Sequence, residues 1–223
     1  MINLVSYSPT LINHAPVANL DDARCRETYW LRQKGSIMDV TTLHTATEVL
    51  AEYLSEVTHG DLRQLTPLAT WDIGDLYVHL IDQNIDTVAG LVNKALVNEG
   101  PPAEKITRSA LEVSAHLYGG GYEERYRRTA RRVEEAFAAV ADAESTYVVG
   151  ELHLAASAWY EEQVNETVIH TWDLTEAMGF TYRPTADVAL RVLKTQPEPP
   201  LEDIDAAWEA ALRKSGRIPS RTH

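Results

Sequence analysis

The stretch WDIGDLYVHLIDQN, residues 71–84, carries the pattern that decides the fold. Asp72 is well suited to cap the start of a helix, and Asp75 complements the positive end of the helix dipole. Apolar side chains then recur every three or four residues, which is the period of one helix face. They are Ile73, Leu76, Leu80, Val88, Leu91 and Ala95. The stretch therefore predicts a long amphipathic helix with one buried side.

The same period returns in three further long segments. The first carries Leu43, Ala46, Leu50, Leu54 and Val57, and Gly60 is expected to end it. Another covers 123–141, and the last covers 154–178, with Gly179 suited to its end. Shorter helices are expected over 104–117, 185–194 and 203–214, and a brief extended piece within STYVVGELH, residues 145–153. Four long helices with mostly short connections predict an all-α four-helix bundle.

The two ends of the chain differ from this core. Residues 1–37 mix Pro, Asn, Ser and Asp with no clear period, so they are expected to form an N-terminal arm. The bundle is expected over 38–180, followed by a short helical C-terminal extension over 181–223. The final residues, SGRIPSRTH, form a basic tail that we expect to fray.

The amino-acid composition limits the classes of molecule that this chain is expected to bind. Twenty basic against 33 acidic residues give a net charge of −13, which disfavours binding to nucleic acid or to an anionic membrane. The single cysteine, Cys25, excludes an internal disulfide and a CxxC zinc site. No apolar run is long enough to span a bilayer, and no secretory signal is apparent. We expect a cytoplasmic monomer or homodimer that acts on a small molecule.

Three side chains are candidates for a metal site. Glu166 and His170 stand four residues apart, so they share one helix face, although a surface hydrogen bond would use the same spacing. His79 sits beside the apolar stripe of another helix, where it is either a core histidine bonded to a carbonyl or tyrosine, or a third ligand. Two histidines and one carboxylate would leave a coordination position open, which is typical of catalytic metals.

Two motifs of the sequence resemble segments of a known protein family. TPLATWDIGDLYVHLI, residues 66–81, and ETVIHTWDLTEAMG, residues 166–179, together resemble segments of the mycothiol-dependent maleylpyruvate isomerase family, in the DinB-like superfamily. The resemblance covers about 39–179. It implies an up-down-down-up DinB-like helical bundle. It also implies a divalent metal, zinc in particular, held by His79, Glu166 and His170, and mycothiol as a thiol cofactor.

Further polar and aromatic residues are candidates for the surroundings of the site. Asp173 follows His170 by three residues and is expected either to orient this ligand or to form a local ion pair. Gln83, one turn after His79, is a second candidate for a catalytic role.

Cofactor contacts are expected on the helix that carries Glu166. Trp159 and Gln163 precede Glu166 on roughly the same face, so they are candidates for lining a cofactor pocket.

These features predict a metal-dependent enzyme that activates a low-molecular-weight thiol for transfer to, or isomerisation of, a small electrophile. Zinc binds thiolate well, and the thiolate is the nucleophilic form of a thiol. Two alternatives remain open at this point. The bundle could bind a metal or ligand without turnover, or it could serve secondary metabolism through a different reaction in the same cavity.

Overall fold

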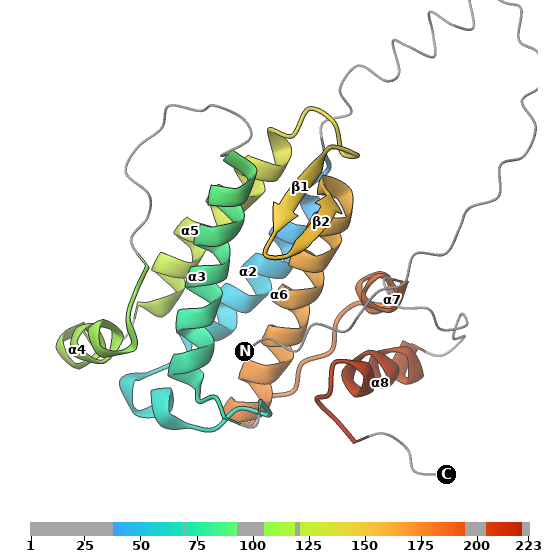
Figure 1. Ribbon diagram of the computed structural model, residues 1–223. Coiled ribbons are helices and arrows are strands. Elements are labelled where there is room, and N and C mark those ends of the chain that lie inside the picture. The colour runs from blue at the N-terminus through green and yellow to red at the C-terminus, as the bar shows by residue number, and fades with distance from the viewer. Residues whose placement is uncertain (1–37, 69, 93–104, 119–120, 195–203, 220–223) are drawn as a thin grey trace, which may run out of the picture. The chain divides into compact units, whose positions relative to one another are not determined.

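The computed structural model describes residues 38–68, 70–92, 105–118, 121–194 and 204–219 (Figure 1). The predicted arm over 1–37 lies outside these residues. The division into arm, bundle and C-terminal extension therefore stays a prediction.

Four long helices form the bundle: α2 (Thr41–Ser55), α3 (Ile73–Val92), α5 (Tyr122–Ala138) and α6 (Ala156–Met178). Helix α2 packs against α5 and α6, and α3 packs most extensively against α5. Figure 1 shows α3 and α5 running one way and α2 and α6 running the other. This confirms the predicted four-helix bundle with up-down-down-up order. No helix in the described ranges combines the length and apolarity needed to cross a membrane.

Shorter elements lie between and after the long helices. They are η1 (His59–Arg63), α4 (Arg108–Tyr118), the antiparallel strands β1 (Thr146–Val149) and β2 (Leu152–Ala155), α7 (Ala186–Lys194) and α8 (Ile204–Lys214). The predicted short helices are confirmed, and the predicted extended piece is part of a two-stranded hairpin, whereas the short helix η1 was not predicted. The expectation that Gly60 ends the first helix is wrong, because α2 already ends at Ser55. Thr58 and Asp61 cap each other and start η1, which then contains Gly60.

The start of α3 is fixed by the two aspartates that the sequence singles out. The amide of Asp75 donates to Oδ1 of Asp72 at 2.9 Å, and the amide of Asp72 lies 3.4 Å from Oδ2 of Asp75. Arg108 of α4 forms ion pairs with both carboxylates. This cluster ties α4 to the first turn of α3, and His79 follows two turns further along.

The core falls into two apolar clusters. One gathers Leu50, Leu54, Leu76, Leu80 and Leu174, and the other centres on aromatic residues of α5 and α6. Within the aromatic cluster, Trp159 meets Phe137 edge-on at 6.1 Å between ring centroids and lies 6.0 Å from the ring of Tyr147. Helices α7 and α8 join the same cluster through residues such as Ala189, Val192, Trp208 and Leu212.

The chain after α8 is ordered by a left-handed turn. Gly216 has φ +75°, and the amide of Arg217 donates to the carbonyl of Leu212 at 2.8 Å. This is the way in which glycine commonly closes the end of a helix. Ile218 then packs against the aromatic cluster. The expectation of a frayed tail is therefore wrong for 215–219, while 220–223 lie outside the described residues.

Gly90 lets α3 pass close to the indole of Trp159. A methyl group at Gly90 would stand 2.5 Å from the Cη2 atom of that ring. We expect Gly90→Ala to lower the free energy of unfolding by about 1–3 kcal/mol, because overpacking outweighs the better helix propensity of alanine. Urea denaturation of the full chain measures this change.

The matched control places Gly90→Ala in a Trp159→Phe background, where the smaller ring leaves room for the methyl group. There the change should be neutral or stabilising by up to about 1 kcal/mol. An equal loss of stability in both backgrounds would contradict this packing.

Candidate metal centre

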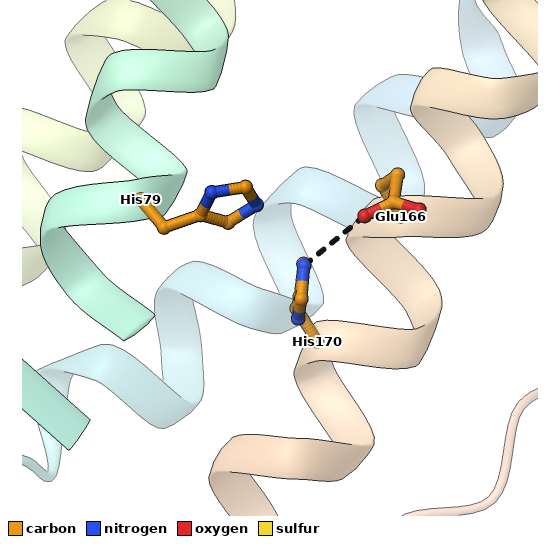
Figure 2. A group of neighbouring side chains, drawn as sticks. All are labelled: His79, Glu166 and His170. Atoms are coloured by element: carbon orange, nitrogen blue, oxygen red, sulfur yellow. Dashed lines mark ion pairs between the residues drawn. The ribbon is translucent and has the colours of Figure 1, made fainter. Parts of the chain in front are cut away.

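Three side chains from two helices converge between α3 and α6. His79 projects from α3, and Glu166 and His170 project from successive turns of α6 (Figure 2). One ligand atom of each residue lies within 4.8 Å of those of the other two. The two imidazole rings are 5.0 Å apart between centroids and nearly perpendicular. The structure thus brings together the three residues that the sequence proposes as ligands.

The site has a buried side and an exposed side. The side chain of His170 is 3% exposed, because α6 is covered by neighbouring elements along most of its length. The side chain of Glu166 is 42% exposed, and His79 is half-buried. Solvent or a small ligand can therefore approach from the side of Glu166.

Asp173 determines which nitrogen of His170 faces the cluster. Nδ1 of His170 lies 2.9 Å from Oδ2 of Asp173, whose side chain is 0% exposed. A carboxylate can only accept here, so Nδ1 carries the proton. Nε2 lies 3.1 Å from Oε2 of Glu166, yet it has no hydrogen-bond partner of proper geometry in the described part of the chain. A histidine held by a carboxylate at one nitrogen and open at the other is typical of metal ligands.

The surroundings of the cluster shift the pKa values of all three candidate ligands. Burial, and then the nearby ring of His170, lower the pKa of His79 to about 4, so His79 is neutral at neutral pH. Partial desolvation would raise the pKa of Glu166, but His170, His79 and Arg217 outweigh it and hold this pKa below its usual value. Burial likewise opposes protonation of His170, but Asp173 and Glu166 prevail and raise its pKa.

Trp71 forms an aromatic wall over the two histidines. Its ring centroid lies 4.8 Å from that of His79, and 6.4 Å from that of His170 in a stacked arrangement. The carbonyl of Trp71 accepts from both the amide and the hydroxyl of Thr66, each at 2.9 Å, which closes the loop before α3. Sequence reasoning missed this contact. The available signal was the place of Trp71 directly before Asp72, the cap of the helix that carries His79.

The other candidates near the ligands lie as follows. Asp173 contacts His170, as described, and also accepts from Arg217. Gln83 is half-buried on α3, one turn after His79. A catalytic role for Asp173 or Gln83 stays a prediction.

The two residues proposed for cofactor binding, Trp159 and Gln163, both contact other side chains inside the bundle. Gln163 accepts from the hydroxyl of Thr87 at 3.1 Å, and its amide donates to Oδ1 of Asn84 at 3.3 Å. Trp159 packs in the aromatic cluster against Phe137. Contact of Trp159 or Gln163 with a cofactor stays a prediction.

The residues present fit a divalent metal ion. Two imidazoles and one carboxylate form a ligand set used by zinc in catalytic sites. Bonds of about 2 Å to each ligand place the ligand atoms within about 4 Å of one another, so small side-chain movements would close the cluster. The buried Nε2 of His170 faces Glu166 at 3.1 Å without a well-formed hydrogen bond, and this is the strongest sign of fit.

Comparison with known proteins finds a family match. A family model described as the mycothiol maleylpyruvate isomerase N-terminal domain matches residues 43–175, which include all three candidate ligands. No curated protein matches the chain.

Two similar solved structures carry related descriptions. The crystal structure of the mycothiol-dependent maleylpyruvate isomerase is 17% identical, with a TM-score of 0.45, and the match covers 60% of this chain and 58% of that one. A histidine-to-alanine mutant of that isomerase is 16% identical, with a TM-score of 0.44 and the same coverage. The chain thus spans somewhat over half the length of these solved chains.

The family match extends over more than half of the chain and takes in most of α2, all of α3 to α5, and most of α6. The chain therefore belongs to the family of the mycothiol maleylpyruvate isomerase N-terminal domain.

Proposed function

We propose that this protein is a metal-dependent enzyme that activates a low-molecular-weight thiol, mycothiol, for transfer to or isomerisation of a small electrophilic substrate. One observation carries the proposal. In a chain of this family, ligand atoms of His79, Glu166 and His170 lie within 4.8 Å of one another.

The protein side chains would prepare the site as follows. His79, neutral because its pKa is about 4, offers a nitrogen lone pair without first losing a proton. Asp173 holds the Nδ1 proton of His170, which leaves Nε2 directed at the cluster. The ionised carboxylate of Glu166 supplies the one negative charge among the three ligands. Together these residues would bind a divalent ion, zinc in particular.

The reaction would use the open side of the cluster. A bound zinc ion would hold the sulfur of the thiol in its thiolate form at neutral pH. Trp71 would shield the imidazoles from water on one side, and Gln83 would offer an amide to the thiol or the substrate. The thiolate sulfur would add to an electrophilic carbon of the substrate. In an isomerisation the new carbon–sulfur bond would break again and return the thiolate.

The first test is turnover of maleylpyruvate, the substrate named for the similar isomerase. The zinc-loaded full chain is expected to convert it only when mycothiol is added, because the protein is proposed to supply the site and the cofactor the nucleophile. His79→Ala should lower the rate at least about 100-fold, since even residues behind a metal ligand cost about 10–100-fold when lost. Absorbance of the substrate follows the reaction.

His153→Ala on strand β2 is the matched control, because His153 is exposed and lies outside the cluster. It should retain the rate of the unaltered chain. An equal rate without mycothiol, or after removal of the metal, would contradict the proposal. Zinc binding without turnover of any electrophile would favour a binding protein.

Zinc affinity should depend on pH through one proton. Zinc must replace the proton of His170, whose pKa is raised, whereas His79 is already neutral. The affinity is therefore expected to rise about tenfold per pH unit up to the pKa of His170 and to level off above it. Competition with a chelator of known protonation, between about pH 5 and about pH 9, measures this slope.

Asp173→Asn provides the control for the pH profile. Without this carboxylate the pKa of His170 should fall, so the affinity should level off at a lower pH. A slope of about two protons per ion across neutral pH would show that His79 is also charged, and would contradict this description of the site.

A further inference from the structure

Arg217, which follows α8, forms an ion pair with Asp173, the buried carboxylate that contacts the candidate metal ligand His170. Nη2 of Arg217 lies 2.9 Å from Oδ2 of Asp173, and Nε lies 3.1 Å from Oδ1. Both carboxylate oxygens are thus engaged, which is the strongest geometry for an arginine–carboxylate pair. The side chain of Arg217 is 14% exposed and that of Asp173 is 0% exposed. Partners this deeply buried differ from a solvated surface pair.

The backbone after α8 directs Arg217 to this position. The left-handed turn at Gly216 places the amide of Arg217 on the carbonyl of Leu212, and Nη1 of Arg217 donates to the carbonyl of Ser215 at 2.8 Å. The guanidinium is therefore held by its own turn as well as by Asp173. Such a restrained side chain loses little freedom when it binds the carboxylate.

Asp173 links Arg217 to the candidate metal ligand His170. Its Oδ2 accepts from Arg217 and also lies 2.9 Å from Nδ1 of His170. The three groups form a continuous chain from the end of α8 to the ring whose Nε2 faces Glu166. Removing the guanidinium would leave the fully buried carboxylate with His170 but without its hydrogen bonds from Arg217. A buried carboxylate that loses such partners shifts position, and this shift would release the ring of His170.

We propose that Arg217 is a positioning residue of the metal centre, which holds His170 in its metal-binding orientation through Asp173 and couples metal occupancy to docking of the end of α8. The inference rests on the proposed metal site and adds to it a residue outside the bundle. Residues 43–175, matched by the family model, do not include Arg217.

The coupling must act in both directions. If a docked Arg217 strengthens metal binding by some factor, the bound metal strengthens docking of Arg217 by the same factor. The backbone amides that close the end of α8, such as that of Arg217 itself, should then exchange their hydrogens more slowly when zinc is bound.

The experiment compares Arg217→Gln with Arg213→Gln in the full chain. Arg213 lies on the same helix and pairs with Glu209 one turn away, so its loss alters the charge of α8 without touching Asp173. Zinc affinity is measured by chelator competition, and hydrogen exchange of residues 204–219 is measured with and without zinc. Arg217→Gln is expected to weaken zinc binding about 10–100-fold, the range for residues that orient a ligand, and Arg213→Gln less than about threefold.

Zinc should slow exchange at the end of α8 in the unaltered chain and in Arg213→Gln, but not in Arg217→Gln. Asp173→Asn should weaken zinc binding to a similar extent, and the double variant should lose little more, because the two residues act as one unit. A purely structural arginine would lower thermal stability and leave the affinity of the folded protein unchanged.

The outcomes separate this inference from the proposed function. If the unaltered chain binds no zinc, both the proposed function and the positioning role of Arg217 are wrong. If it binds zinc and Arg217→Gln binds equally well, Arg217 has no positioning role and the metal site stands. If Arg217→Gln does not fold, exchange in the unaltered chain decides, and unchanged protection of α8 on adding zinc overturns the coupling.

Discussion

The contact between Nδ1 of His170 and the buried carboxylate of Asp173 is the interaction on which the rest of the site depends. It fixes the ring and its proton, and so leaves Nε2 to face Glu166 and His79. A carboxylate with no exposed surface is costly unless it is well partnered, and here an imidazole and a guanidinium share it. Buried polar contacts on one side of His170 thus direct its other nitrogen toward Glu166 and His79.

The helix packing explains why the cluster forms between α3 and α6. The reciprocal cap of Asp72 and Asp75 sets where α3 begins, and therefore the direction in which His79 points. On α6, a spacing of four residues puts Glu166 one turn from His170. The loop held by Thr66 then places Trp71 across both rings. The helix cap and the Glu166–His170 spacing are local, whereas the contact of Trp71 with His170 joins distant parts of the sequence.

Much of this arrangement could be predicted from the sequence, because helix period and ligand spacing are local properties. The apolar stripe of α3 and the Glu166–His170 pair follow from the order of residues alone. The place of His79 beside that stripe makes it a candidate third ligand, and the family resemblance implies the same role. The aromatic contact of Trp71 and the return of Arg217 to Asp173 depend on loop conformation. The tail looked frayed because a short basic segment with one glycine carries no period, and its turn is stabilised only by tertiary contacts.

X-ray absorption at the zinc edge, on the zinc-loaded full chain and on His79→Ala, tests the central claim most directly. Coordination by His79, Glu166 and His170 predicts two imidazole ligands with the remaining ligands oxygen, and one imidazole fewer in the variant. An unchanged coordination shell in His79→Ala, or a protein sulfur ligand, would contradict it.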